Sequence, residues 1–186
     1  MFRFIVATLC LGLAFSKTNP SRNRFLEAME QNKCYWTHKS TYTYMDKKCF
    51  RYEVVDQHKD KKFTLLQRYQ VNGNGPEPVL VYKNFSATFR KVGQTSTLTL
   101  QDETSTVKYT FGFWNKSEKC FVLTYKVDHG LGGPLGNECD LNILGKLPDH
   151  EIPFPSCTAA LRKVCPHGTK SKDLKGNCIN SDSEDV

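Results

Sequence analysis

The chain has 186 residues, of which 39% are hydrophobic and 24% are charged, and its formal net charge is +7. This length suits one domain with a hydrophobic core and leaves little room for a second. The lysines and arginines are scattered along the chain, which favours an ordinary solvated surface over a site for nucleic acid or another anionic partner.

The N-terminus has the features of a secretory signal peptide. Arg3 is its only cation, an apolar run follows over residues 4–15, and the small residue Ser16 marks a cleavage point. That run is too short to span a bilayer, and no later segment approaches the roughly 20 apolar residues of a membrane helix. We therefore expect residues 1–16 to be removed and residues 17–186 to form one secreted domain that inserts into no membrane.

Cysteine usage agrees with an oxidising compartment. Of the eight cysteines, Cys10 lies in the predicted signal peptide, and the other seven predict up to three disulfides with one cysteine left over. No Cys-x-x-Cys pair occurs, so a metal site is not favoured. Two Asn-x-Ser sequons, at Asn84 and Asn115, are candidate glycosylation sites that fit the secretory route.

A short amphipathic helix is predicted over residues 22–32. Phe25, Leu26 and Met29 fall on one face of this segment, and Ser21 stands where an N-cap is expected. We expect its apolar face to cover one end of a sheet structure.

From residue 34 the apolar period changes to two, which is typical of strands. The segment 79–92 reads as one long strand or as two, because polar residues interrupt its pattern. The strongest turn signal lies at 72–78, and the glycine-rich segment 130–136 predicts a flexible loop. The alternating segments are 34–44, 49–55, 63–71, 79–92, 98–100, 107–113, 121–127 and 140–144.

The C-terminal part predicts one more helix and a polar tail. The segment 156–164 has Cys157, Ala160 and Leu161 on one face, with Ser156 as a candidate N-cap. The tail begins at about residue 167. About eight strands in meander order, with a helix before and a helix after, predict an all-β fold: an eight-stranded antiparallel barrel that can hold one small ligand.

An exported eight-strand pattern of this kind resembles a lipocalin, although the usual Gly-x-Trp of the first strand is replaced by Trp36 without the glycine. The cysteine positions and the Glu-Cys-Asp-Leu segment at 138–141 make the chain similar to the salivary lipocalins of ticks, the histamine-binding family. The resemblance implies disulfides Cys49–Cys178, Cys120–Cys157 and Cys139–Cys165. Cys34 is then left over; a monomer is expected, with a Cys34-linked dimer as the alternative.

The resemblance also indicates where a ligand would bind. Amine-binding members carry an acidic residue after the seventh-strand cysteine and Glu-Leu-Trp or Glu-Leu-Tyr on the eighth strand. Here the first position is Phe121, and the triplet is Asp140-Leu141-Asn142. Only one carboxylate survives, in shortened form, and the aromatic wall of the triplet is lost, so the expected cavity is more apolar than an amine site.

Strand alternation extends the implied site to an aromatic-rich set, for which ordinary barrel core is the alternative at each position. His38 is more simply a hydrogen-bonded barrel histidine, whereas for Asp140 a solvated carboxylate at a strand end and a ligand anchor are both left open. The set favours a lipid, sterol or eicosanoid over a biogenic amine. Its members are Trp36, His38, Tyr42, Tyr44, Phe111, Phe113, Phe121, Leu123, Tyr125, Asp140 and Asn142.

No catalytic motif or phosphate-binding loop is present, so neither catalytic residues nor a cofactor is predicted. Two functions remain open. The first is a salivary protein that sequesters a small host mediator and dampens inflammation or immunity. The second is an immunomodulator that binds a host protein through loops such as 130–136.

Overall fold

The computed structural model describes residues 19–44, 46–58, 62–73, 77–127, 136–146, 154–165, 171–174 and Cys178. The predicted signal peptide, most of the 130–136 loop and most of the tail lie outside these residues. None of the helices in the described ranges has the length and apolarity needed to cross a membrane.

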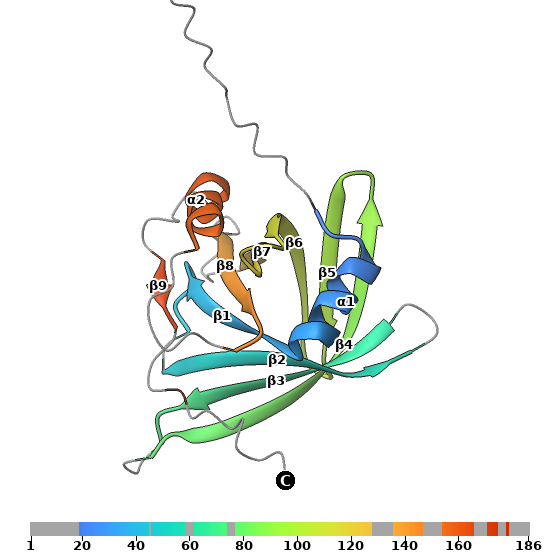
Figure 1. Ribbon diagram of the computed structural model, residues 1–186. Coiled ribbons are helices and arrows are strands. Elements are labelled where there is room, and N and C mark those ends of the chain that lie inside the picture. Colours follow the sequence, from blue (N-terminus) through green and yellow to red (C-terminus); the bar gives the residue numbers. More distant parts are fainter. Residues whose placement is uncertain are drawn as a thin grey trace, which may run out of the picture.

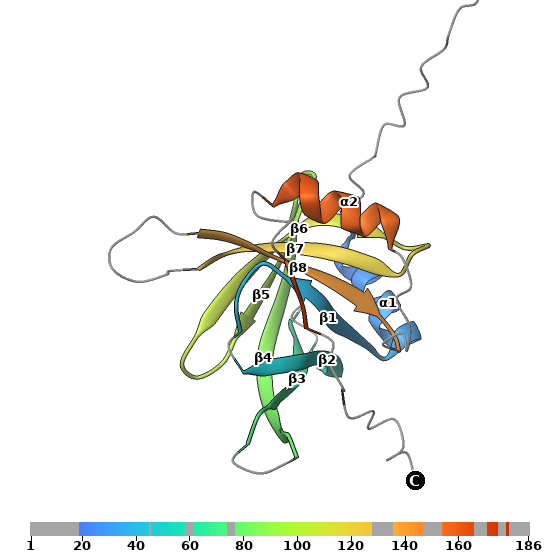
Figure 2. The same cartoon turned by 90° about the vertical axis from the view of Figure 1, so that its left-hand side faces the viewer.

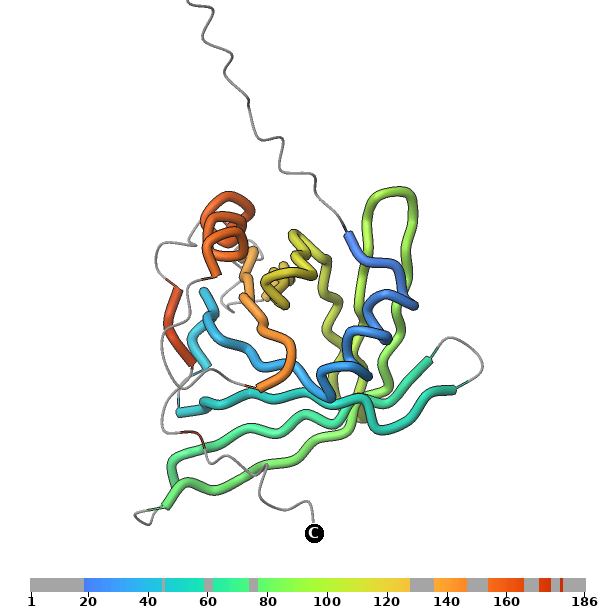
Figure 3. Tube along the Cα trace, in the orientation of Figure 1, coloured from blue at the N-terminus to red at the C-terminus, as the bar shows by residue number. Residues whose placement is uncertain are grey.

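Eight antiparallel strands of the described chain close into a barrel (Figure 1), which confirms the predicted fold class. Each strand pairs with the next, and β1 also pairs with β8, so the first and last barrel strands lie side by side (Figure 3). A short β9 (Lys172–Asp173) adds to β1. The barrel strands are β1 (Cys34–Ser40), β2 (Lys47–Gln57), β3 (Lys62–Val71), β4 (Val79–Val92), β5 (Thr95–Gln101), β6 (Thr106–Asn115), β7 (Cys120–Val127) and β8 (Gly136–Leu144).

The helix α1 (Arg22–Asn32) fills one end of the barrel, as its apolar face predicted. The hydroxyl of Ser21 accepts a hydrogen bond from the backbone N–H of Arg24 and caps the helix. Phe25 is fully buried, with its ring centroid 5.6 to 6.4 Å from those of six rings. These six rings come from five strands, so this end of the barrel is packed with aromatic side chains: Tyr35, Phe63, Phe89, Phe111, Trp114 and Phe121.

The helix α2 (Pro155–Val164) packs outside the barrel against β6, β7 and β8 (Figure 2). The prediction that Ser156 caps this helix is wrong, because the helix already begins at Pro155. The carboxylate of Glu118, in the turn between β6 and β7, instead accepts hydrogen bonds from the backbone N–H groups of Ser156 and Cys157. A residue distant in sequence therefore provides the cap, which strand and helix patterns cannot reveal.

We expect Glu118→Ala to lower the free energy of unfolding by about 1 kcal/mol, because the first turn of α2 loses a charged acceptor. Urea denaturation of the disulfide-intact protein measures this difference. Lys116→Ala, in the same exposed turn, is the matched control and should change stability by less than about 0.5 kcal/mol. Equal losses in the two variants would contradict the capping role.

The three implied disulfides are confirmed: Cys49–Cys178, Cys120–Cys157 and Cys139–Cys165. Two of them fasten the α2 segment to β7 and β8, and the third ties the tail to β2. Cys34 keeps its thiol, which donates to the carbonyl oxygen of Gly145 and is part of a side chain only 4% exposed. Its burial weighs against a Cys34-linked dimer.

The two sequons lie in different surroundings. Asn84 is exposed on β4, whereas Asn115 is partly buried, and its side-chain oxygen accepts hydrogen bonds from Ser117 and Glu118. Both remain predicted glycosylation sites, and Asn84 is the more accessible of the two in the folded protein.

Candidate functional site

A β-bulge in β1 decides which of its side chains enter the barrel. The pairing with β8 shifts between Thr37 and Lys39, so that Thr37 lies opposite Asn142 and Ser40 lies opposite Asp140. Thr37 and Ser40 therefore both face inward, although they are three residues apart. Strict alternation would have placed them on opposite faces.

Because of this bulge, the prediction that Trp36 and His38 line the barrel is wrong. Trp36 packs outside with Cys34 and Cys49, beneath the guanidinium of Arg51. The His38 ring lies outside against Phe154, with Nδ1 3.8 Å from a carboxylate oxygen of Asp173. After the bulge the even positions turn inward, so Tyr42 and Tyr44 do pack against the barrel core, as predicted.

A second bulge, in β6, has the same effect. Phe111 lies opposite Leu123, and Phe113 lies opposite Val122, which leaves Gly112 as the extra residue. Phe111 and Trp114 consequently belong to the barrel core, while Phe113 packs outside under α2. The prediction for Phe113 is wrong, and Trp114 is an inward residue that the alternation pattern missed.

The inner faces of β7 and β8 match the predicted positions. Phe121 lies opposite Asn142, and Leu123 lies opposite Asp140. Tyr125 lies opposite Glu138, a residue that the sequence reasoning did not assign to the site. Its position two residues before Asp140 on one strand was the available signal, because side chains at i and i+2 share a face.

Asp140 is the polar centre of the barrel interior and is only 3% exposed. Its two carboxylate oxygens accept hydrogen bonds from the hydroxyls of Tyr44 and Tyr125, each at 3.2 Å, and Ser40 is a further hydrogen-bond partner. Burial raises the pKa of Asp140 to about 6; the hydrogen bonds oppose this rise, and the nearby Glu138 carboxylate adds to it. The alternative of a solvated strand-end carboxylate is therefore wrong.

Five tyrosines surround this carboxylate. The hydroxyls of Tyr44 and Tyr125 are 2.9 Å apart, and the ring of Tyr109 is 5.1 Å from that of Tyr125. The rings of Tyr35 and Tyr52 stack at 4.6 Å. Burial, and then the negative charge of Asp140 together with other tyrosines, raise the pKa of these phenols, so at neutral pH they stay protonated.

No lysine, arginine or histidine within the described ranges forms an ion pair with Asp140. A carboxyl group with a pKa of about 6 is mostly ionised at neutral pH, so its charge is balanced only by hydroxyl dipoles. Burying a charge without a counter-charge is costly. The site can therefore gain free energy from a bound cation.

Asn142 is held by its protein neighbours. Its side-chain oxygen accepts a hydrogen bond from the hydroxyl of Thr37, and its side-chain NH₂ donates to the backbone oxygen of Asp140. Deeper in the same network, Gln67 donates to the hydroxyl of Tyr52 at 2.6 Å. These contacts leave Asp140 as the better ligand anchor.

A pocket of about 260 Å³ lies next to the cluster, between the end of β1, β2 and β9. Tyr42 and Tyr44 form part of its wall, and Lys47, Lys48 and Asp173 form part of its rim. Tyr44 lines this pocket and also donates to Asp140, so one side chain contacts both the pocket and the carboxylate.

One group in the described structure has metal-ligand geometry: Glu118, Cys120 and Cys157. Its two cysteines form a disulfide with each other, and Glu118 caps α2, so these atoms serve structural roles.

Comparison with known proteins identifies the fold. No family model and no curated protein matches the sequence. Among solved structures, japanin from Rhipicephalus appendiculatus, in a form bound to cholesterol, matches with a TM-score of 0.58 at 12% identity, over 79% of this chain and 95% of that one. Two apocrustacyanins match similarly: apocrustacyanin C1 with a TM-score of 0.56 (13% identity, 90% of this chain and 92% of that one) and lobster apocrustacyanin A1 with a TM-score of 0.53 (14% identity, 86% of this chain and 88% of that one).

These neighbours are lipocalins, and the closed eight-stranded barrel with its two helices is the lipocalin fold. At such low identity the likeness shows the fold alone.

Proposed function

We propose that this protein is a secreted lipocalin that sequesters a small cationic amine in its barrel. The observation that carries the proposal is Asp140: a buried, mostly ionised carboxylate that has tyrosine hydroxyls around it and forms no ion pair with a cation of the described residues. A protonated amine would supply the missing charge, and the surrounding tyrosine rings would add cation–π attraction.

The packing of the barrel supports a small ligand. Rings clustered around Phe25 occupy the end next to α1, and Tyr44, which donates to Asp140, lines a pocket of about 260 Å³. A sterol needs a long apolar cavity, whereas a biogenic amine such as histamine or serotonin fits a short polar one. The geometry thus shifts the preference from the lipid that the sequence favoured to the amine.

A neutral apolar ligand, a sterol or eicosanoid, is the second candidate. It is supported by the aromatic walls and by the cholesterol bound to japanin, which shares this fold. Such a ligand would leave Asp140 without a counter-charge, so it ranks below the amine.

The setting of this activity follows from the secretory features and from the resemblance to tick salivary lipocalins. Three disulfides support an extracellular location. In saliva, capture of a host mediator would dampen the host's inflammatory response. Host-protein binding through the 130–136 loop would involve residues that lie mostly outside the described ranges.

Titration calorimetry of the chain from residue 17 tests the proposal, with histamine, serotonin and cholesterol as separate ligands. We expect at least one amine to bind with a Kd of about 1 µM or below. Binding of cholesterol without binding of either amine would support the second candidate instead, and binding of none would overturn both.

A further inference from the structure

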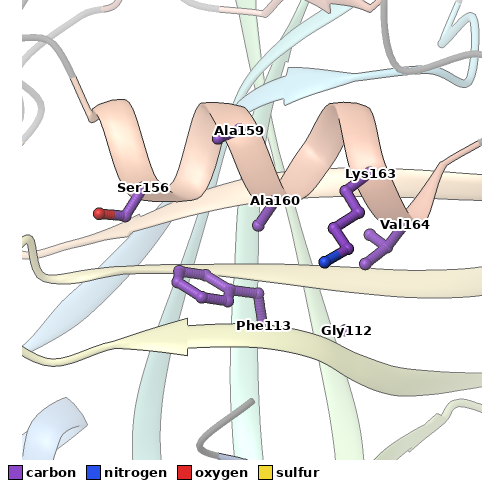
Figure 4. A pocket seen from close by; sticks show the side chains of 7 residues that line it. All are labelled: Gly112, Phe113, Ser156, Ala159, Ala160, Lys163 and Val164. Atoms are coloured by element: carbon purple, nitrogen blue, oxygen red, sulfur yellow. The ribbon is translucent and has the colours of Figure 1, made fainter. Parts of the chain in front are cut away.

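A second pocket, separate from the barrel interior, lies between α2 and β6 and has a volume of about 200 Å³ (Figure 4). The β6 bulge creates its floor, because it turns Gly112 and Phe113 to the outer face together. Along its middle, α2 contributes the small side chains of Ala159 and Ala160, with Ser156 at one end and Lys163 and Val164 at the other. Small side chains over a bulge leave a space that larger ones would fill.

The close approach of α2 limits the pocket on one side. A Cβ atom added to Gly112 would lie 3.2 Å from Cγ2 of Val164, which is tighter than most Cβ contacts, so glycine lets the helix rest on the strand there without a shift of Val164. Next to this contact, the ring of Phe113 forms an apolar floor and is 7% exposed. The space is shaped for an apolar group lying along the helix.

Charge is distributed unequally along the pocket. Lys163 lies at the end near Val164, and Figure 4 shows its ammonium turned toward the sheet. No carboxylate in the described part of the chain forms an ion pair with Lys163. At the other end, near Ser156, the Glu118 carboxylate already occupies the helix N-terminus and would repel an anion.

From this geometry we infer that the α2–β6 pocket binds a small amphipathic carboxylate, such as a medium-chain fatty acid. The acyl chain lies on Phe113 against Ala159 and Ala160, and the carboxylate pairs with Lys163. Ser156 and Lys163 are seven helical residues apart, or about 10 Å, which matches a linear eight-carbon acid. Drug-sized ligands need about 300 Å³ or more, so the pocket suits only a smaller molecule.

The inference is tested with octanoate as the probe, by titrating the disulfide-intact mature protein and following backbone amide shifts by NMR. Shift changes should centre on residues 112–113 and 156–164. We expect Lys163→Gln to weaken octanoate binding at least fivefold and Ala159→Leu, which fills the pocket, at least tenfold. Arg162→Gln removes a neighbouring exposed cation outside the pocket and should change the affinity less than twofold. Octylamine, with the same chain and opposite charge, should bind at least fivefold more weakly than octanoate.

Unchanged octanoate affinity in both Lys163→Gln and Ala159→Leu would overturn the inference, as would shift changes confined to the barrel mouth. Ala159 is exposed, so its replacement should not prevent folding. The test is independent of the proposed amine site: Asp140→Asn should leave octanoate binding unchanged, and Lys163→Gln should leave amine binding unchanged.

Discussion

Replacing Asp140 with Asn is expected to weaken amine binding at least 100-fold, which corresponds to about 3 kcal/mol. Asn142 and the tyrosines remain in place, so the variant removes the charge and keeps the shape of the site. Calorimetry with the amine that binds the unmodified protein measures the loss. A neutral ligand such as cholesterol should lose far less, because it makes no ion pair.

Asp46→Asn is the matched control, since Asp46 is an exposed carboxylate that lines the neighbouring pocket. It should reduce amine affinity less than threefold, because exposed charges are well screened. If the two variants bind the amine equally well, general attraction of cations to the barrel mouth explains the binding, and Asp140 is not the anchor.

The second large effect concerns the stability of the ligand-free protein. The pKa of Asp140 is about 6 in the folded state and about 3.8 in the unfolded chain, so the folded state binds the proton more tightly. Stability from this group is therefore present below pH 3.8 and is lost as the pH rises to 6. The complete loss, reached about one pH unit above the folded pKa, amounts to about 3 kcal/mol, and it stays constant at higher pH.

Asp140→Asn should abolish this contribution. Between pH 4 and pH 7, the free energy of unfolding of the variant should therefore rise relative to that of the unmodified protein by about 2.4 kcal/mol. Urea denaturation of both proteins at each pH measures the difference, in which the titrations of groups that do not interact with Asp140 cancel. A difference that stays constant over this pH range would show that Asp140 has an ordinary pKa in the folded protein.

The loss of folding stability caused by the buried charge of Asp140 is informative about function. An amide or an apolar side chain at position 140 would avoid the burial of a charge, and folding alone gives no reason to keep a carboxylate there. Residues that reduce stability without an offsetting structural role are typical of binding and catalytic sites. Asp140 fits this description, whereas Glu118 does not, because its carboxylate caps a helix.

The sequence was sufficient to predict the barrel, both helices and the disulfide pairing, because these depend on periodicity and on a recognisable cysteine framework. The prediction that Trp36, His38 and Phe113 face the barrel interior was wrong for one physical reason. A bulge inserts a single residue and reverses the facing of everything before or after it. Nothing in the local composition of β1 or β6 marks where this occurs, although Gly112 is compatible with it.

The ligand preference depended on context that the sequence could not supply. The eighth-strand triplet indicated a depleted amine site, because only Asp140 remained of the expected carboxylates. In the structure, Tyr44 from the segment after β1 and Tyr125 from β7 both reach that carboxylate. Glu138 lies beside them on β8. Convergence of residues that are distant in sequence turns one acidic residue into a site.

The central claim is that Asp140 is a buried carboxylate that binds a cationic ligand. NMR titration of its side-chain ¹³Cγ resonance tests this claim most directly. In the ligand-free mature protein the titration midpoint should lie near pH 6. With saturating histamine or serotonin it should fall by more than about one pH unit, because a bound ammonium stabilises the ionised form. A midpoint near 6 that neither amine moves would contradict the claim.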